Sequence, residues 1–474
     1  MTATADELPT DAAPCGPRQL QSVLGPEYRA LTVGILAVVS LIAFEAMAVA
    51  TAMPVAVRDL GGLRFYALAF SAFLTTSLVG MVVAGDVSDR RGPLLPFVVA
   101  VVTFGIGLVL AGAATSMWPF VIGRAIQGFG AGLNIVALYV VIGRVYPDAL
   151  RPRLFSAMAS AWVLPAIIGP FIAGVVADQL SWRWVFLAVP PLIVPAVLLM
   201  LPRLRSLGVA AAPGGARRRT IPAVGAGLGV ALLQYAGQRL DLVALPIFVV
   251  GAGMLAVSVP HLLPRGTLLA RRGLPTAILM RGILAGSFFG AETFVPLMLI
   301  EERGMATAVA GLTLTGGAVS WSIGSWIQGR PSTTVPRFRL IQWGTGLVGV
   351  GVAALSLALW PALPPLVGGV GWMLAGLGMG LAMSSVNVVM LALSPAAEQG
   401  FNSAALQVSD ALGSILFIGV GGAIFAGLHE GEGGNAGVFL LIYLLMAAIA
   451  LAGSLAAPRV RGQAPAEPAA VPVG

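Results

Sequence analysis

Residues 65–115 read FYALAFSAFLTTSLVGMVVAGDVSDRRGPLLPFVVAVVTFGIGLVLAGAAT, which is two apolar stretches separated by a short charged segment. The stretches 65–85 and 94–115 each match the ~20 apolar residues that a helix needs to cross the hydrocarbon core of a bilayer. The segment between them, GDVSDRRGP at residues 85–93, contains two aspartates and two arginines, which favour water. The pattern predicts two membrane helices joined by a polar loop.

The remainder of the chain has the same character. Of its 474 residues, 58% are hydrophobic, a further 61 are glycine and 10% are charged, whereas soluble domains have about 25% charged residues. This composition excludes a water-soluble domain and a disordered chain, and it predicts an all-α integral membrane protein. The fourteen predicted spans are 31–57, 65–85, 94–115, 118–142, 155–178, 184–201, 221–238, 242–262, 275–300, 305–328, 340–360, 364–393, 402–428 and 437–457. The Gly-rich stretches 221–238 and 242–262 are the weakest, and without both of them the count is twelve.

The placement of the 27 basic residues, all of them arginine, predicts the orientation of the chain. If the N-terminus is cytoplasmic, 20 arginines fall on the inner side, 5 on the outer side and 2 within spans, as the positive-inside rule requires. Both termini are therefore expected in the cytoplasm, for fourteen spans or for twelve. The net charge of +8 is explained by this topology, so no nucleic-acid partner is expected.

The chain also resembles itself at a fixed separation. Glu45 and Glu292 are 292 − 45 = 247 positions apart, and two Ser-Ala pairs have the same separation. GFGAGL begins at Gly128 and GLGMGL at Gly376, which are 248 positions apart. The repeat predicts two six-helix bundles in the same orientation with two helices inserted between them. The expected divisions are a cytoplasmic tail 1–28, a first bundle 29–201, an Arg-rich loop 202–220, inserted helices 221–262, a second bundle 263–457 and a cytoplasmic tail 458–474.

Several motifs resemble those of one transporter family. The loop at residues 85–93 fits the pattern G-x-x-x-D-R-x-G, RAIQGFGAG at 124–132 fits R-x-x-Q-G-x-G, and IGPFIAG at 168–174 is a degenerate G-P-x-x-G-G. In FEAMAVATAMP at 44–54 an acid precedes a proline by nine residues, and SWRWVFLAVP opens the sixth span. Together these motifs resemble the major facilitator superfamily, and within it the 14-helix drug:proton antiporters. The chain departs from that pattern in having Glu45 in place of aspartate and Pro93 in place of a basic residue, which removes part of the loop's charge network.

The resemblance implies roles for individual residues. In the loop it implies a gate for the conformational switch, formed by Gly85, Asp89, Arg90 and Gly92. In the fourth and fifth spans it implies close helix packing at Gly128, Gly169, Pro170 and Gly174. It also implies that the arginine of the fourth span, Arg124, lies buried near Glu45 and that this pair couples transport to protons.

Three acids lie within predicted spans, where each is costly. They are Glu45, Glu292 and Asp410, and each either takes part in function or is neutralised by a structural hydrogen bond. Polar stripes at helical spacing should line a cavity, because they cannot face lipid. The stripes are Arg124, Gln127, Ala131 and Asn134 in the fourth span and Ser403, Gln407, Asp410 and Ser414 in the thirteenth. The predicted substrate cavity contains Glu292, Asp410, Gln407, Gln127, Asn134, Phe288 and Trp321, although such aromatic residues more often serve packing.

The two arginines within spans have an alternative explanation. Arg124 lies about two turns from the outer end of its span, so its side chain can extend to the interface instead of pairing with an acid. Arg281 lies close to the cytoplasmic end of its span, and extension to the interface is the expected arrangement there.

The expected function is proton-coupled export of amphipathic compounds across a bacterial plasma membrane. Uniport or symport of a defined solute, export of a lipid or envelope precursor, and a non-transporting receptor or scaffold remain alternatives. An apolar cavity with few polar groups suits lipophilic substrates better than sugars. No signal peptide, enzymatic motif, cofactor or metal site is expected, since Cys15 is the single cysteine and His261 and His429 lie at span ends. The expected partners are a small amphipathic substrate, protons and the bilayer, and the expected state is a monomer.

Overall fold

The computed structural model describes residues 22–147, 150–206, 217–239, 244–329, 335–395, 398–429 and 434–461, and these residues form helices and connecting turns. The first group of helices is α1 Arg29–Asp59, α2 Tyr66–Arg91, α3 Leu94–Gly112, α4 Met117–Val145, α5 Arg151–Gln179, α6 Arg183–Leu187 and α7 Val189–Arg205. Then come α8 Arg217–Arg239 and α9 Ala244–Leu262. The last group is α10 Leu274–Glu292, α11 Val295–Glu301, α12 Thr307–Gly329, α13 Arg337–Leu355, α14 Leu366–Leu393, α15 Gln399–Leu428 and α16 Ala436–Ala456. The short 3₁₀ segments are η1 Leu63–Phe65, η2 Ser356–Leu359 and η4 Ala457–Val460.

The prediction of an all-α membrane fold is confirmed, because each of the fourteen predicted spans coincides with helix in the described residues. Within the described residues, twelve helical segments are long and apolar enough to cross a membrane. The two predicted spans outside that set are α8, whose apolar part is Val224–Gly237, and α12, which carries several glycine, serine and threonine residues.

Some helix boundaries differ from the predicted ones. The charged segment after the second span is not a loop, because α2 continues to Arg91 and turns only at Gly92, whose φ of 78° suits glycine. Arg90 and Arg91 occupy the last turn, where cations are stabilised by the helix dipole. The ninth span is interrupted between Glu292 and Val295, because Pro296 has no N–H to donate to the carbonyl of Glu292 four residues earlier.

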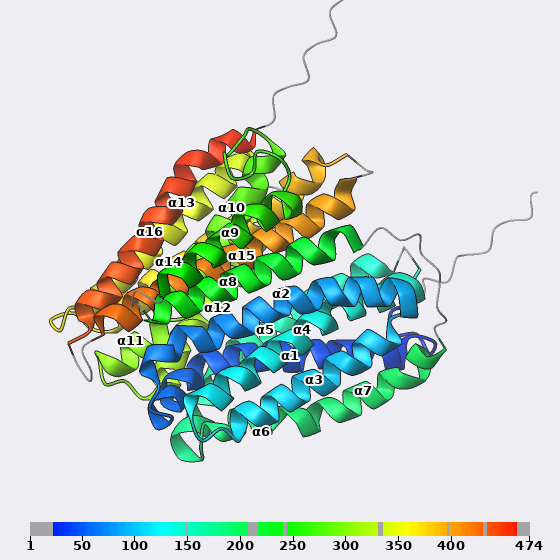
Figure 1. Ribbon diagram of the computed structural model, residues 1–474, viewed down its shortest axis with the longest axis horizontal. Coiled ribbons are helices and arrows are strands. Elements are labelled where there is room, and N and C mark those ends of the chain that lie inside the picture. Colours follow the sequence, from blue (N-terminus) through cyan, green and yellow to red (C-terminus); the bar gives the residue numbers. More distant parts are fainter. Residues whose placement is uncertain are drawn as a thin grey trace, which may run out of the picture.

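The two groups of helices form two bundles with matching internal packing (Figure 1). In the first, α2 and α3 both pack against α4, and in the second, α12 and α13 both pack against α14. Glycines allow these close approaches. A Cβ added at Gly128 would overlap the carbonyl of Phe73, and one added at Gly376 would overlap the carbonyl of Gly317. The repeat at 248 positions is therefore also a repeat of backbone contacts.

The inserted helix α8 contacts both bundles. It packs on α2 from the first bundle and on α15 from the second, and α9 packs against α8 (Figure 1). Leu78 of α2, Val230 of α8 and Ile415 of α15 belong to one buried apolar cluster. The Gln234 side chain of α8 also donates a hydrogen bond to the carbonyl of Ile415 at 3.3 Å.

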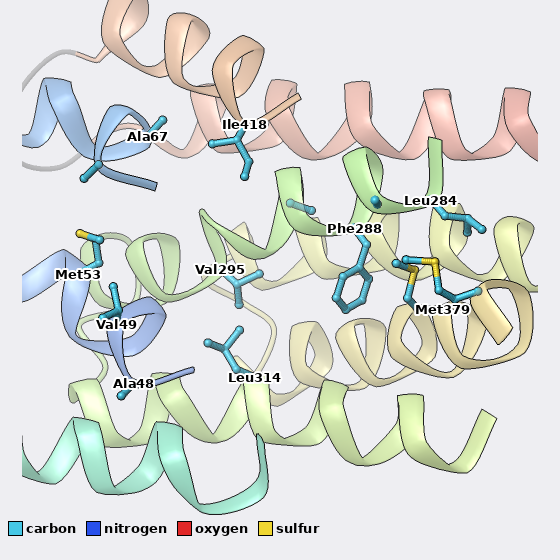
Figure 2. Close-up of a cluster of buried hydrophobic side chains, with 14 of the residues drawn as sticks. Ala48, Val49, Met53, Ala67, Leu284, Phe288, Val295, Leu314, Met379 and Ile418 are labelled. Atoms are coloured by element: carbon cyan, nitrogen blue, oxygen red, sulfur yellow. The ribbon is translucent and has the colours of Figure 1, made fainter. Parts of the chain in front are cut away.

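Apolar side chains fill the contact between the bundles, as Figure 2 shows. Val49 and Met53 of α1 face Val295 of α11 and Leu314 of α12 in this cluster. Farther along, the Tyr66 hydroxyl donates to the carbonyl of Thr293 at 2.6 Å.

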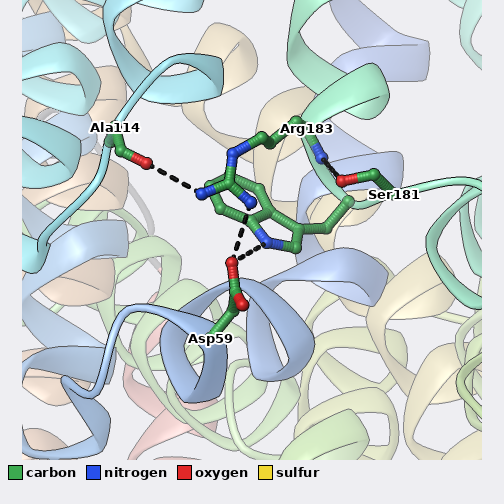
Figure 3. Close-up of polar contacts among 5 residues, drawn as sticks. Asp59, Ala114, Ser181 and Arg183 are labelled. Carbon is green, nitrogen blue, oxygen red and sulfur yellow. Dashed lines mark hydrogen bonds and ion pairs between the residues drawn. The ribbon is translucent and has the colours of Figure 1, made fainter.

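The ends predicted to face outside carry ion pairs within and between the bundles. Arg58 at the end of α1 pairs with Glu301 at the end of α11 at 2.5 Å, and the Glu301 side chain is 2% exposed. Within the first bundle, Asp59 accepts hydrogen bonds from Arg183 at 2.8 Å and from the Trp182 indole at 3.0 Å (Figure 3). Arg183 also donates to the carbonyl of Ala114 at 3.1 Å, so α1, α6 and the turn before α4 are tied together.

The orientation can be tested with single cysteines in a Cys15→Ser background. An impermeant thiol reagent applied to whole cells is expected to label Gln238→Cys, at the end of α8, but not Thr334→Cys, because the arginine pattern puts the first outside and the second inside. Cys15 and Thr334 lie outside the described residues. Protection of position 238 would mean that 221–262 does not cross the membrane twice.

Candidate functional site

The first bundle contains a buried ion pair between α1 and α4. Arg124 donates to Glu45 Oε1 at 2.9 Å and to the side-chain oxygen of Gln127 at 2.5 Å. The Arg124 side chain is 4% exposed and that of Glu45 0%. The guanidinium also lies over the ring of Phe73 in α2, with its central carbon 4.5 Å from the ring centroid. Arg124 therefore pairs with the acid and does not extend to the interface.

Some polar atoms of this ion pair and of its neighbour Gln127 lack hydrogen-bond partners within the described part of the chain. Glu45 Oε2 and the Gln127 amide nitrogen are buried and have no hydrogen-bond partner among the described residues. A buried carboxylate retained in this way is costly unless its counter-ion stays in place. The arrangement can therefore respond to the addition or removal of one proton or one positive charge.

A cavity of about 340 Å³ lies beside the pair on the side of the bundle formed by α1, α2, α4 and α5. Phe73 connects the two, since it lies under Arg124 and lines the cavity. The wall is mostly aliphatic and aromatic, with Asn134, Tyr139 and Ser77 as its polar groups. The residues lining it are Val39, Ile42, Ala46, Phe73, Ser77, Met81, Ala131, Asn134, Ile135, Leu138, Tyr139, Met158 and Trp162. Of the residues predicted for the cavity, Asn134 lines this one, whereas Gln127 is not among the lining residues and accepts a hydrogen bond from Arg124.

The second bundle contains another ion pair, which corrects the prediction for Arg281. Its Nε donates to Asp410 Oδ1 at 2.6 Å, and one terminal nitrogen donates to the side-chain oxygen of Asn387 at 3.0 Å. The expected extension to the interface does not occur, because an acid on the neighbouring helix α15 gives the guanidinium a nearer partner. This pair is more open than the first, with the Arg281 side chain 12% exposed and that of Asp410 26%.

The remaining predicted cavity residues are dispersed over the second bundle. Glu292 is partly exposed at the break between α10 and α11, and no described residue forms an ion pair or hydrogen bond with its carboxylate. Gln407 is exposed one turn before Asp410. Phe288 is buried and stacks on Trp372 with ring centroids 4.5 Å apart, while Trp321 meets Phe288 edge-on at 5.4 Å. These aromatic side chains pack against one another, so for Phe288 a role in packing fits the structure better than a role in lining a substrate cavity.

The gating motif lies at the end of α2. Gly92 ends the helix, and Gly85 faces open space. Arg90 is exposed at this end, whereas the side chain of Asp89 lies outside the described part of the chain. Arg144 of α4 donates to the carbonyl of Ser88 at 3.3 Å and so links α4 to the same turn.

The predicted packing motifs differ in how tightly they pack. Gly128 is in close contact with α2, as described above, and a Cβ at Gly174 would overlap the backbone of Ala308 in the other bundle. The carbonyl of Pro170 lies against Gly311 of α12. Gly169 has only ordinary contacts with α1.

Sequence reasoning missed three contributors to these sites. Tyr139 and Trp162 line the cavity, and Asn387 holds Arg281. The spacing from Asn134 to Tyr139 is not that of one simple helical stripe, and tryptophan near a span end also fits an interface belt. For Asn387, the sequence feature that indicates a functional or structural role is a polar side chain within an apolar span.

Comparison with known proteins gives consistent matches. The family model of the Major Facilitator Superfamily matches residues 35–418. The multidrug transporter protein MdtP of Bacillus subtilis is 26% identical over 415 residues, which covers 83% of this chain and 74% of that protein. A probable multidrug-efflux transporter of Mycobacterium tuberculosis is 24% identical over 443 residues, covering 85% of this chain and 88% of that protein. Among solved structures, a POT family transporter in complex with 5-aminolevulinic acid has a TM-score of 0.69 at 15% identity, covering 93% of this chain and 99% of that one. At this identity, the structural likeness shows the fold.

Proposed function

The chain belongs to the major facilitator superfamily, a family of membrane transporters, and on that basis we propose that it exports amphipathic compounds in exchange for protons. The observation that carries the proposal is the buried Glu45–Arg124 pair beside an apolar cavity. The likeness to proteins named as multidrug transporters supports the same reading. We propose a bacterial plasma membrane as its location, a monomer as its state, and the proton gradient, without a cofactor, as its energy source.

The proposed cycle alternates access to the cavity between the two sides of the membrane. On the outer side, where protons are more abundant, Glu45 takes up a proton, its attraction for Arg124 weakens, and substrate leaves. On the inner side the proton leaves, the carboxylate pairs with Arg124 again, and substrate binds. The contacts Arg58–Glu301 and Tyr66–Thr293 at the predicted outer ends fit a state whose outer side is closed.

The proposed substrates are lipophilic molecules with few polar groups. The cavity offers aromatic and aliphatic surface with three polar side chains, which suits shape-tolerant binding better than recognition of a sugar. Glu292 is proposed to attract cationic substrates, because no described cation neutralises it.

Transport into inverted membrane vesicles tests the function. With an imposed pH gradient, amphipathic dyes and drugs are expected to accumulate in vesicles that contain the protein and not in vesicles from cells without it. Collapse of the gradient with a protonophore should release them. Accumulation that survives the protonophore would contradict proton coupling, and a panel without any transported compound would contradict export.

Asp89 and Arg90 are proposed to act on the conformational switch. Consecutive residues of a helix do not face each other, so each is proposed to pair with a neighbouring helix, and such a pair at this solvated end of α2 should bias the two states by only about 1 kcal/mol. Asp89→Asn is therefore expected to slow transport several-fold while equilibrium ligand affinity, measured on purified protein, stays within a few-fold. Unchanged turnover with a large loss of affinity would contradict the gating role.

A further inference from the structure

The pair Arg281–Asp410 lies on helices of the second bundle that correspond to helices lining the cavity of the first. The cavity of the first bundle is lined by α1, α2, α4 and α5, whose counterparts in the repeat are α10, α12, α14 and α15. Arg281, Asn387 and Asp410 come from three of these, namely α10, α14 and α15. Asn387 is also 387 − 139 = 248 positions after Tyr139, which lines the cavity, and both side chains are exposed.

The second pair is not a copy of the first. Counting 247 positions from Glu45 and 248 from Arg124 leads to Glu292 and Trp372, so the arginine and acid of the second bundle stand at other places on their helices. At 1.5 Å per residue, Arg281 lies about 10 Å along α10 from its first residue, whereas Glu45 lies about 24 Å along α1. The second pair is thus nearer to the predicted cytoplasmic entrance than the first.

The two pairs also differ in what they can offer to a ligand. In the first, both side chains are almost completely enclosed, whereas Asp410 is 26% and Arg281 12% exposed. Asp410 uses one oxygen for the pair, and Arg281 uses two of its five N–H groups, for Asp410 and Asn387. One carboxylate oxygen of Asp410 and further guanidinium hydrogens of Arg281 therefore remain for a molecule that reaches this surface of the second bundle.

We propose that Arg281 and Asp410 form a subsite for zwitterionic amphipathic substrates, with Arg281 binding the substrate's anionic group and Asp410 its cationic group. The proposal rests on the proposed export function and specifies a class of substrate for it. Asn387 keeps Arg281 oriented while its bond to Asp410 loosens.

The expected selectivity for zwitterions follows from the free-energy cost of leaving a largely buried charge without a partner. A cation that takes Asp410 leaves Arg281 with only the neutral Asn387, and an anion that takes Arg281 leaves Asp410 alone. A zwitterion replaces one ion pair by two, so each protein charge keeps a partner. At this subsite, singly charged analogues are therefore disfavoured because they leave one protein charge without a partner, and zwitterions should bind there about tenfold more tightly or better.

The test uses three matched ligands on one aromatic scaffold: an amino acid form with free amine and carboxylate, its methyl ester, and its N-acetyl derivative. Equilibrium binding is measured on the purified full-length protein in lipid nanodiscs, by competition with a transported dye that carries no charge. The wild type should prefer the amino acid form about tenfold or more over both derivatives. The double variant Arg281→Gln, Asp410→Asn removes both charges at nearly constant size and should abolish this preference while binding of the neutral dye persists.

A matched control neutralises an exposed ion pair. Arg203 and Glu27 are 3.3 Å apart with side chains 44% and 59% exposed, and Arg203→Gln, Glu27→Gln should retain the preference. If the wild type does not prefer the zwitterion, or if the double variant at 281 and 410 keeps the preference, the subsite is refuted. If the subsite is refuted but the wild type still exports the dye in vesicles, the proposed export function stands. If the wild type shows no pH-driven export of any compound, the proposed export function is itself refuted.

Discussion

Replacing Glu45 by glutamine is expected to abolish pH-driven, uphill export while leaving the protein folded. The carboxamide keeps the size of the side chain and can still accept a hydrogen bond from Arg124, which now lies 2.9 Å from the carboxylate. It cannot take up and release a proton. Each elementary charge that moves across 100 mV supplies about 2.3 kcal/mol, which supports a substrate gradient of roughly 50-fold. The variant should lose that gradient and retain at most downhill exchange.

The measurement is dye accumulation in inverted vesicles with and without an imposed pH gradient. Glu27→Gln is a suitable control, because this acid is exposed and pairs only with Arg203 among the described residues. Glu292→Gln should change mainly which substrates are accepted, with the strongest loss for cations. Full accumulation by Glu45→Gln together with its loss in Glu292→Gln would reverse the assignment of the two acids. If neither change matters, the chain is not a proton antiporter.

The second large effect is expected from Arg124→Gln. This change leaves the fully buried Glu45 carboxylate without its counter-ion, and breaking a buried ion pair on one side costs about 3–5 kcal/mol. The variant is expected to be recovered at lower yield and to unfold at a lower temperature in detergent. Fluorescence-detected thermal unfolding of the purified protein measures the difference.

The double variant Arg124→Gln, Glu45→Gln distinguishes a stranded charge from lost packing. With both charges gone, the unpaired carboxylate no longer exists, so most of the lost stability should return. Loss of stability that is equal in the single and double variants would mean that the guanidinium matters for its packing over Phe73 and not for its charge.

The contrast between the two arginines shows how far the sequence leads. Arg124 could be placed near Glu45 because the motif around it resembles a known family pattern. Arg281 gave the opposite expectation, since a position close to the cytoplasmic end of a span favours extension to the interface. Its true partner, Asp410, is 129 residues away, and only the packing of α10 against α15 brings the two together.

Helix boundaries show a similar limit. The pattern of apolar residues predicts where the chain enters and leaves the bilayer, and each span predicted in this way is helical. The pattern does not predict that α2 continues through its charged end to Arg91, because hydropathy reports the solvent and not the hydrogen bonding of the backbone. The break after Glu292 did have a signal, namely Pro296, whose effect on the carbonyl four residues earlier follows from covalent geometry alone.

Because α8 bridges the two bundles, the two lipid-facing sides of the molecule present different surfaces to a compound that diffuses within the bilayer. Along one seam between the bundles, α8 packs on both α2 and α15, and α9 packs against α8. Along the other seam α5 and α12 meet directly, with the Thr315 hydroxyl donating to the carbonyl of Ile167 at 3.0 Å. A lipid-dissolved molecule that approaches sideways therefore meets an extra helical layer on one flank and a bare helix–helix junction on the other.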